Sequence, residues 1–276
     1  IIKIMSDLGV SKIRFTGGEP LLRKDLLDLI KYTYQKTDIS SIHLTTNGVL
    51  LSRNIDQLVK AGLDGINISL DTLNKEKFKK ITRREELDKV LEGLDLAISS
   101  GLKSIKVNIV AMKDFNNDEI IDFVELTRDN DITVRFIELM PFDSHQIWKT
   151  GKFYKADQIV NDLKSHYNTL KPVIGSSTEY YIYKIKKYMG RVAVIPSYSR
   201  SLCSACNRIR ITADGNLLNC LYSQTETNIR DAMRTGMQDS EIARLIIGAM
   251  QKKLKDGWIA QSEGKESRES MTQIGG

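Results

Sequence analysis

Residues 41–73, SIHLTTNGVLLSRNIDQLVKAGLDGINISLDTL, contain two short β-branched runs on either side of a helical pattern. The runs SIHLTT and GINISL are typical of strands, and SRNIDQLVKAG between them has apolar residues three and four positions apart before a glycine. Two neighbouring strands joined through a helix run parallel in one sheet. The stretch therefore predicts a strand-helix-strand unit.

The same alternation continues along the chain. Further strand-like runs begin at residues 12, 104 and 132, with helical patterns between them. Five such units are visible, fewer than the eight of a closed barrel. Near residue 141 the pattern changes to a helix around 156–168, two β-like runs, a cysteine segment and a helix-rich tail. We predict an α/β protein with a parallel sheet and a different C-terminal part.

Alternate residues of the predicted strands form a polar face, although both faces of a helix-covered parallel sheet are normally apolar. The polar positions are Arg14, His43, Thr45, Asn67, Ser69, Lys106, Asn108 and Arg135. The opposite positions are apolar, which predicts a polar lumen inside an apolar wall. Its three cations, Arg14, Lys106 and Arg135, favour a large anionic ligand. Half-exposed antiparallel strands are the alternative.

Composition restricts the class of protein. The 276 residues are 41% hydrophobic and 28% charged, enough for a large globular core. No apolar run reaches the ~20 residues that span a bilayer, so we expect no membrane segment. Three clustered cysteines suit a reducing compartment, and we expect a cytoplasmic protein. The net charge of +6 favours anionic partners, but an aromatic content of 7% argues against an RNA-binding module.

All three cysteines lie in CSACNRIRITADGNLLNC, residues 203–220. Cys203 and Cys206 are spaced to hold one metal centre, and Cys220 returns across the ADGN turn of a predicted hairpin. A closed zinc site needs a fourth ligand, and the three histidines are remote in sequence. An iron–sulfur cluster with one open iron is favoured, and zinc remains the alternative.

The predicted strands end in sequences that suit a ligand site. TGGEP follows the first strand, TNG the second, LDT the third and ELMP the fifth. In barrels of this class the chemistry occurs at the carboxyl ends of the strands. Gly17 and Gly18 allow a ligand to approach the backbone, and Glu19 is suited to anchor an amine or hydroxyl.

Several motifs together resemble the GTP 3',8-cyclase family of radical S-adenosylmethionine (SAM) enzymes. They are RFTGGEPLLRKD, LTTNGVLL, INISLDTL, IKVNIV, RFIELMP, CSACNRIRITADGNLLNCL and the terminal IGG, and they span essentially the whole chain. The resemblance implies an incomplete TIM-type barrel of six strand-helix units over residues 1–140. It implies a C-terminal α+β region over residues 141–276 with a second [4Fe-4S] cluster and a double-glycine tail.

The resemblance also implies a reaction and the residues that perform it. The enzyme would be a lyase of molybdenum cofactor biosynthesis that converts GTP to (8S)-3',8-cyclo-7,8-dihydroguanosine 5'-triphosphate. A 5'-deoxyadenosyl radical would take the ribose 3' hydrogen, and the carbon radical would add to purine C8. The implied SAM contacts are Gly18, Glu19, Ser69 and Met140. The implied GTP contacts are Arg14, Thr45, Lys106, Arg208, Ile209 and Arg210. The implied cluster ligands are Cys203, Cys206 and Cys220, and the implied catalytic residues are Arg135, Gly275 and Gly276.

One motif of the family is missing from the sequence as given. The three cysteines that hold the SAM-cleaving [4Fe-4S] cluster precede GGEP in the family, but no cysteine occurs before residue 203 here. We expect that an N-terminal segment, with the first strand and that cluster, is lacking. The alternatives are a truncated, non-catalytic GTP-binding iron–sulfur paralogue or another radical SAM enzyme with a C-terminal auxiliary cluster.

The resemblance implies partners as well. They are GTP, an electron-donor protein such as flavodoxin or ferredoxin, and the downstream cyclic pyranopterin monophosphate synthase. A homodimer is left open. Neither a nucleic acid nor a membrane is expected as a partner.

Overall fold

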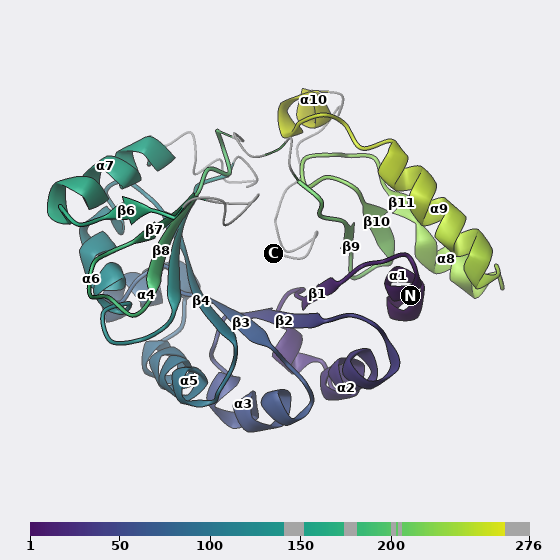
Figure 1. Ribbon diagram of the computed structural model, residues 1–276, viewed down its shortest axis with the longest axis horizontal. Coiled ribbons are helices and arrows are strands. Elements are labelled where there is room, and N and C mark those ends of the chain that lie inside the picture. The colour runs from purple at the N-terminus through teal and green to yellow at the C-terminus, as the bar shows by residue number, and fades with distance from the viewer. Residues whose placement is uncertain (141–151, 174–180, 200–202, 204–205, 263–276) are drawn as a thin grey trace.

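The computed structural model describes residues 1–140, 152–173, 181–199, 203 and 206–262. Within these residues an eight-stranded sheet curves into an open arc with helices on its outer side (Figure 1). Its strand order is β1-β2-β3-β4-β5-β8-β7-β6. β1 to β5 and β8 run parallel, whereas β7 and β6 are antiparallel additions at one edge. The predicted incomplete α/β barrel is confirmed, and the antiparallel alternative for the first five strands is wrong.

The elements of this barrel follow the predicted alternation. Its strands are β1 (Lys12–Phe15), β2 (Ser41–Thr46), β3 (Gly65–Ser69), β4 (Ser104–Ala111), β5 (Thr133–Glu138), β6 (Lys171–Pro172), β7 (Tyr181–Lys184) and β8 (Arg191–Ile195). Its helices are η1 (Pro20–Leu22), α2 (Leu26–Lys36), α3 (Leu51–Lys60), α4 (Lys75–Thr82), α5 (Leu87–Ser99), η2 (Asn117–Glu119), α6 (Ile120–Glu125) and α7 (Ala156–His166). No helix in the described ranges combines the length and the apolar character that crossing a bilayer requires.

The predicted division at residue 140 stays a prediction. The large sheet crosses this position, because β8 pairs with β5 in parallel register and β7 pairs with β8. The strand-like runs that the sequence places in the C-terminal part therefore extend the barrel sheet.

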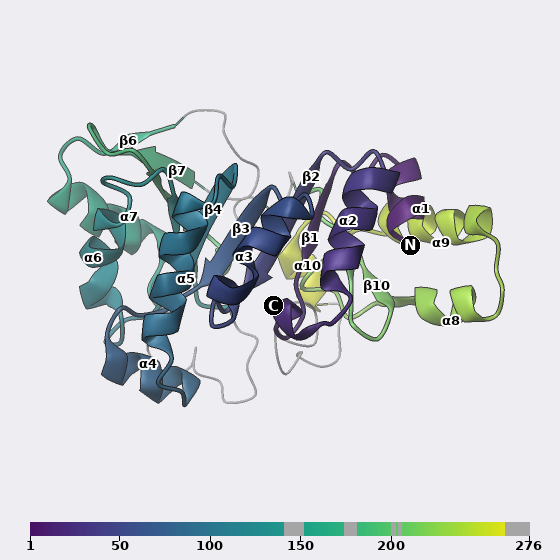
Figure 2. The same ribbon diagram turned by 90° about the horizontal axis from the view of Figure 1, so that it is seen from below.

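A second, three-stranded sheet lies beside the β1 edge of the barrel (Figure 1). It consists of β9 (Arg210–Ile211), β10 (Asn216–Leu218) and β11 (Thr227–Asn228), and its helices are α8 (Ile229–Arg234), α9 (Asp239–Gln251) and α10 (Gly257–Ser262). The first helix of the chain, α1 (Ile2–Asp7), packs on α9, as Figures 1 and 2 show. Ile4 and Met5 of α1 share a small core with Leu217, Ile242 and Ile246. This core holds the β9–β10 hairpin next to β1.

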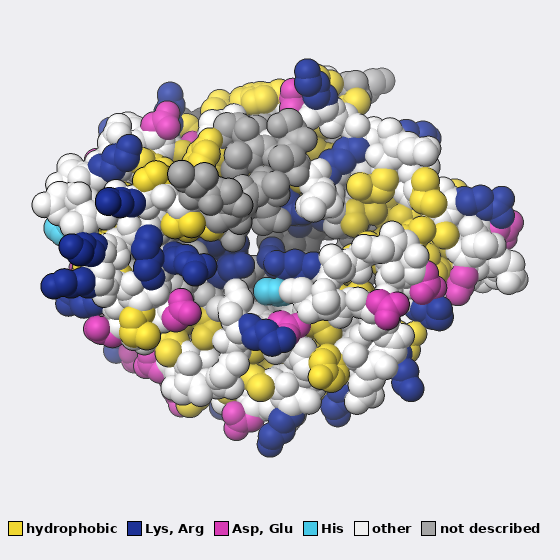
Figure 3. Space-filling model, viewed as in Figure 1, with side chains coloured by type: hydrophobic (Ala, Val, Ile, Leu, Met, Phe, Trp, Pro, Cys, Tyr) yellow, Lys and Arg dark blue, Asp and Glu magenta, His cyan; other side chains and the backbone are white. Residues whose placement is uncertain are grey.

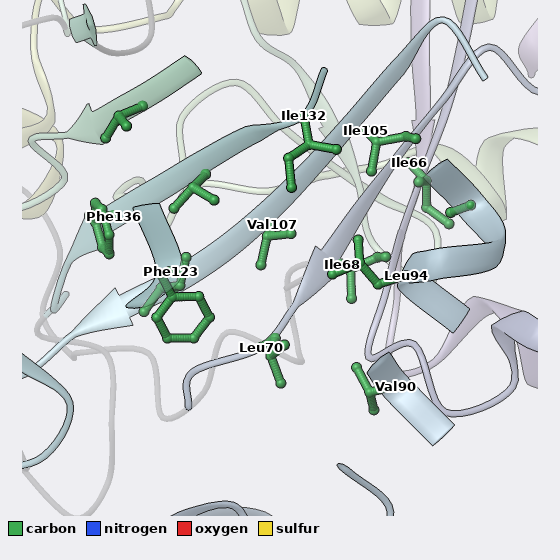
Figure 4. Packing of buried hydrophobic residues seen from close by; sticks show 14 of the residues in the cluster. Ile66, Ile68, Leu70, Val90, Leu94, Ile105, Val107, Phe123, Ile132 and Phe136 are labelled. Carbon is green, nitrogen blue, oxygen red and sulfur yellow. The ribbon is translucent and has the colours of Figure 1, made fainter. Parts of the chain in front are cut away.

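The apolar side of the parallel strands packs against the outer helices (Figure 4). Ile66 and Ile68 of β3 and Val107 of β4 are fully buried in one cluster with Val90 of α5 and Phe123 of α6. Each such side chain contributes about 1.5–3 kcal/mol when it leaves water. Because this wall fixes the strands, the side chains on their other face have fixed positions too.

Helix α3 shows how the sequence sets the length of an element. Leu51, Ile55 and Leu58 are buried at the three- and four-residue spacing of one helix face. Gly62, just beyond the helix end, has φ +103°, and an added Cβ would lie 2.5 Å from Cγ of Tyr34. Only glycine fits that backbone and that space, so the chain turns there towards β3.

Candidate active site

The registers of the parallel strands place the predicted polar residues in one row on the inner face of the arc. From β1 to β5 the row consists of Arg14, His43, Thr45, Asn67, Ser69, Lys106, Asn108 and Arg135. Arg14 is paired with His43, Thr45 with Asn67, and Asn108 with Arg135. Residues paired across parallel strands share a face, so the predicted alternation is confirmed.

Arg135 is the buried cation of this row, with 3% of its surface exposed. Its Nε donates a hydrogen bond to Oδ1 of Asn108 at 2.7 Å. A guanidinium keeps its charge at all relevant pH values, and burying that charge is costly. The amide of Asn108 is neutral, so this bond satisfies one donor and leaves the charge of the guanidinium unchanged.

Asn67, on β3, contacts side chains from three other strands across the lumen. With its amide oxygen facing the guanidinium groups, that oxygen accepts from Nε of Arg14 at 3.2 Å and from Nη2 of Arg135 at 3.3 Å. It also accepts from Oγ1 of Thr45 at 3.2 Å. The first and fifth strands of the arc thus meet on one side chain of the third.

The positive charges of the lumen act on His43, whose exposed fraction is 4%. Burial, followed by the charges of Lys12, Arg14 and Lys106, lowers the pKa of His43 to about 3, whereas Asp64 opposes this shift. The imidazole is therefore neutral near pH 7, with Nε2 2.8 Å from Oγ of Ser41. Figure 3 shows Lys and Arg side chains in a row along the hollow at the centre of this face.

The turn after β1 is fixed by Glu19. Its Oε1 accepts from the backbone N–H of Leu21 at 3.0 Å and from Oγ1 of Thr46 at 2.7 Å. Its Oε2 accepts from the backbone N–H of Asn47 at 2.8 Å. The sequence suggested an anchor for a ligand amine, and the structure adds that this carboxylate joins the ends of β1 and β2.

The other predicted SAM contacts lie at or just beyond the carboxyl ends of strands. Gly18 is exposed, and no atom lies within 4 Å of the position that a Cβ would take. Ser69 is exposed at the last position of β3. Met140, two residues beyond β5, packs with Cys220 against a cluster formed by Tyr222 and Ala260. Gly18 and Ser69 thus lie at the same edge of the sheet, while Met140 borders the cysteine segment.

The cysteine segment has a positively charged surrounding. All three cysteines are free thiols and half-buried. Nζ of Lys253 donates to the carbonyl oxygens of Cys206 at 2.9 Å and Arg208 at 3.0 Å and lies 3.6 Å from Sγ of Cys206. Burial raises the pKa of Cys206, but hydrogen bonds and charge from Arg208 and the charge of Lys253 outweigh it, so that pKa is lowered. The thiolate form that metals require is favoured.

The three sulfurs are not brought together into a metal-binding group. Among the described residues, which include all three cysteines, no set of three Cys, His, Asp or Glu side chains is arranged to hold a metal ion. The chemistry of the donor set nevertheless fits an iron–sulfur cluster, since iron–sulfur clusters are held by thiolates. The three-cysteine ligand set stays a prediction.

Arg210 connects this segment with the barrel. Burial, then the charges of Arg208 and Arg14, lower the pKa of Arg210 to about 10, while Cys206 and Cys220 act in the opposite direction. Arg210 therefore lies within electrostatic reach of the cysteines and of the lumen. The expected hairpin is present, and its strand β9 begins at Arg210. Arg208 precedes the strand and is exposed.

Two residues that position the site were missed from the sequence. Glu138, at the end of β5, is 1% exposed and accepts from the backbone N–H groups of Ala156 at 2.7 Å and Tyr198 at 2.9 Å. Its place in ELMP at a strand end could have indicated it. Lys253 gave no such signal, because it lies two residues beyond α9 and approaches Cys206 only in the folded chain. Gly275 and Gly276 lie outside the described residues.

Two family models match the chain. The Radical SAM superfamily matches residues 1–127, and Molybdenum Cofactor Synthesis C matches residues 132–258. The GTP 3',8-cyclase of Chlorobaculum tepidum is 45% identical over 276 residues, 100% of this chain and 83% of that protein. The GTP 3',8-cyclase of Syntrophomonas wolfei is 41% identical over 283 residues, 100% of this chain and 85% of that protein.

A solved structure shares the fold. SuiB of Streptococcus suis bound to S-adenosylmethionine aligns with a TM-score of 0.59, covering 98% of this chain and 68% of that one. The sequence identity of 16% limits this likeness to architecture.

Proposed function

Because the chain belongs to the radical SAM superfamily and to its GTP 3',8-cyclase family, we propose that GTP is cyclised in the polar lumen between the barrel and the hairpin. The protein is a radical SAM lyase of molybdenum cofactor biosynthesis. The observation that carries the proposal is the row of cationic and polar side chains that the strand registers bring to one face, where the charge of Arg14 also acts on Arg210 of the hairpin. The product is (8S)-3',8-cyclo-7,8-dihydroguanosine 5'-triphosphate.

The cations of the lumen bind the triphosphate in this proposal. Arg14, Lys106 and Arg210 approach from β1, β4 and β9, and Arg208 adds a fourth charge at the rim. Guanidinium groups suit phosphate oxygens because two parallel N–H donors match two acceptors. Thr45 and the backbone of Ile209 complete the GTP contacts. Arg135, the buried cation, acts on the reacting part of the nucleotide and is proposed as catalytic.

Gly18, Glu19, Ser69 and Met140 are proposed to hold SAM. The open space at Gly18 supports a close approach of the ligand to the backbone. A carboxylate offers about four lone-pair positions, two on each oxygen. In Glu19 two donors bind Oε1 and one binds Oε2, so Oε2 can accept one more hydrogen bond. When bound, SAM and an iron–sulfur cluster supply the one-electron chemistry that starts the reaction.

Cys203, Cys206 and Cys220 are proposed to hold a [4Fe-4S] cluster at the C-terminal side of the lumen. Lys253 and Arg208 support this role because they favour the thiolate of Cys206. Three thiolates on four irons leave one iron for the substrate. The double-glycine tail, Gly275 and Gly276, is proposed to take part in the reaction.

The proposal places the enzyme in the cytoplasm. It would receive electrons from a protein such as flavodoxin or ferredoxin. It would pass its product to cyclic pyranopterin monophosphate synthase. A homodimer is compatible with these roles.

The test is an anaerobic assay with GTP, SAM and a reductant on the reconstituted enzyme that carries the expected N-terminal cluster segment. The cyclisation removes one hydrogen atom from the ribose and returns one electron and one proton, so the product should have the mass of GTP. We expect a new nucleotide of that mass together with 5'-deoxyadenosine. GTP binding without any new nucleotide would instead support the non-catalytic paralogue.

A further inference from the structure

Asn67 occupies the middle of the lumen row. It lies on β3 between Thr45 of β2 and Lys106 of β4, and it is 1% exposed. Its amide oxygen accepts from Arg14 at 3.2 Å and Arg135 at 3.3 Å, which come from β1 and β5. One neutral oxygen therefore brings together two guanidinium groups that their own strands hold apart.

The neutrality of this acceptor is informative. Two like charges that converge on one atom repel each other, most strongly where water is excluded. A carboxylate in the same place would make stronger, charge-assisted hydrogen bonds to both groups. Stability alone would thus favour Asp over Asn at this position. Asn gives the geometry without subtracting from the charge of either arginine.

We propose that Asn67 is a positioning residue that gathers Arg14 and Arg135 around a neutral oxygen and so directs the charge of Arg14 at the triphosphate of GTP and that of Arg135 at its reacting part. This inference rests on the proposed function, and it adds the residue that sets the spacing of the two guanidinium groups. Asn67 needs no contact with GTP in this role. Thr45, which donates to the same oxygen at 3.2 Å, holds the amide in its orientation.

Aspartate and alanine at this position separate positioning from a purely structural role. If Asn67 only stabilised the fold, Asn67→Asp would keep both hydrogen bonds and bind GTP better than Asn67→Ala. Our proposal predicts the reverse order. Asn67→Ala loses the bridge and should weaken GTP binding about tenfold, whereas Asn67→Asp also cancels charge and should weaken it about a hundredfold. The thermal midpoint of Asn67→Asp should equal or exceed that of Asn67→Ala.

The control adds the same charge one strand away. Asn108 accepts from Nε of Arg135 alone among the hydrogen bonds described for its side chain. Asn108→Asp should therefore weaken GTP binding less than Asn67→Asp does. GTP affinity is measured by calorimetry on each reconstituted variant, and the melting transition is recorded on the same samples.

The outcomes separate this inference from the proposed function. If the wild-type enzyme binds no GTP, the proposed function fails. If the wild type binds GTP and Asn67→Asp binds it at least as well as Asn67→Ala, only the role of Asn67 is overturned. If Asn67→Asp does not fold, Asn67→Ala is compared with Asn108→Ala. Equal losses of GTP affinity in those two would also overturn the inference, since Asn67 contacts two guanidinium groups and Asn108 one.

Discussion

Arg210 of the hairpin lies within electrostatic reach of Arg14 of β1, and the charge of Arg14 helps to lower the pKa of Arg210 to about 10 after burial and Arg208. The two arginines come from different modules of the chain, and their repulsion opposes folding. The small core shared by α1 and α9 provides the apolar contacts that hold the modules together. An anion between the arginines would replace this repulsion with attraction to both of them, which is the physical basis for the triphosphate site that we propose.

Replacing Arg210 tests that site. Arg210→Ala removes a charged hydrogen-bond donor, and a bond of that kind is worth about 1.5–3 kcal/mol, so GTP binding should weaken about ten- to hundredfold. The melting temperature should stay the same or rise, because the repulsion from Arg14 and Arg208 disappears. Arg234→Ala, an exposed position on α8, is the control and should leave GTP affinity unchanged. Wild-type GTP affinity in Arg210→Ala would remove this residue from the site.

The proposed cluster at the three cysteines leads to a prediction of the iron content of the protein. Anaerobic reconstitution should add about four irons per chain to the three-cysteine site. Replacing Cys203, Cys206 or Cys220 with Ser should lower that iron content and the visible absorption of the cluster. Metal analysis by mass spectrometry checks the result. Stoichiometric zinc with no iron uptake would show that the donor set has been misread.

Two buried groups give opposite pH dependences of stability. His43 has its pKa lowered from 6.5 to about 3, so the unfolded chain binds its proton first and stability is lost as pH falls below 6.5. Burial raises the pKa of Asp71 from 3.8 to about 6, although the hydrogen bond from the backbone N–H of Val110 acts in the opposite direction. The folded protein therefore binds this proton more tightly than the unfolded chain, and Asp71 adds stability as pH falls through 6. Between pH 4 and 6 the two contributions partly cancel.

Single variants should separate these contributions. Relative to wild type, His43→Gln should gain about 2 kcal/mol of unfolding free energy when pH falls from 7 to 5. Asp71→Asn should lose about 1 kcal/mol over the same interval. Urea unfolding at both pH values measures each difference. A wild-type pH dependence in His43→Gln would mean that folding does not change the pKa of His43.

Replacing either tail glycine should uncouple SAM cleavage from cyclisation. In the enzyme with its expected N-terminal cluster segment, Gly275→Ala or Gly276→Ala should abolish cyclic product while 5'-deoxyadenosine formation continues, because the proposed role of the tail uses backbone conformations that only glycine adopts readily. Both products are quantified in one assay. Gly264→Ala, in the polar run before the tail, is the matched control and should retain both. Full cyclic product from either terminal variant would assign these glycines no part in the reaction.

The sequence by itself determined the barrel and its lumen. Strand β2 was predicted at its observed bounds, and the alternation of His43 and Thr45 with Ile42 and Leu44 already assigned two faces. Such patterns are local, because side chains alternate every two residues whatever the strand pairs with. The open barrel follows from counting strand-helix units, and the anionic ligand follows from the cations on the polar face.

Only the tertiary structure decided which distant residues meet. Three relationships depend on strand order, curvature and the packing of α1 on α9. They are the pairing of β8 with β5, the approach of Lys253 to Cys206, and the contacts of Asn67 with Arg14 and Arg135. These contacts join segments far apart in the chain, and no periodicity encodes them. In the sequence, Asn67 is only one polar residue among several, and nothing indicates that it lies between two arginines. The contacts behind its proposed role form only because the arc brings β1 and β5 to opposite sides of β3.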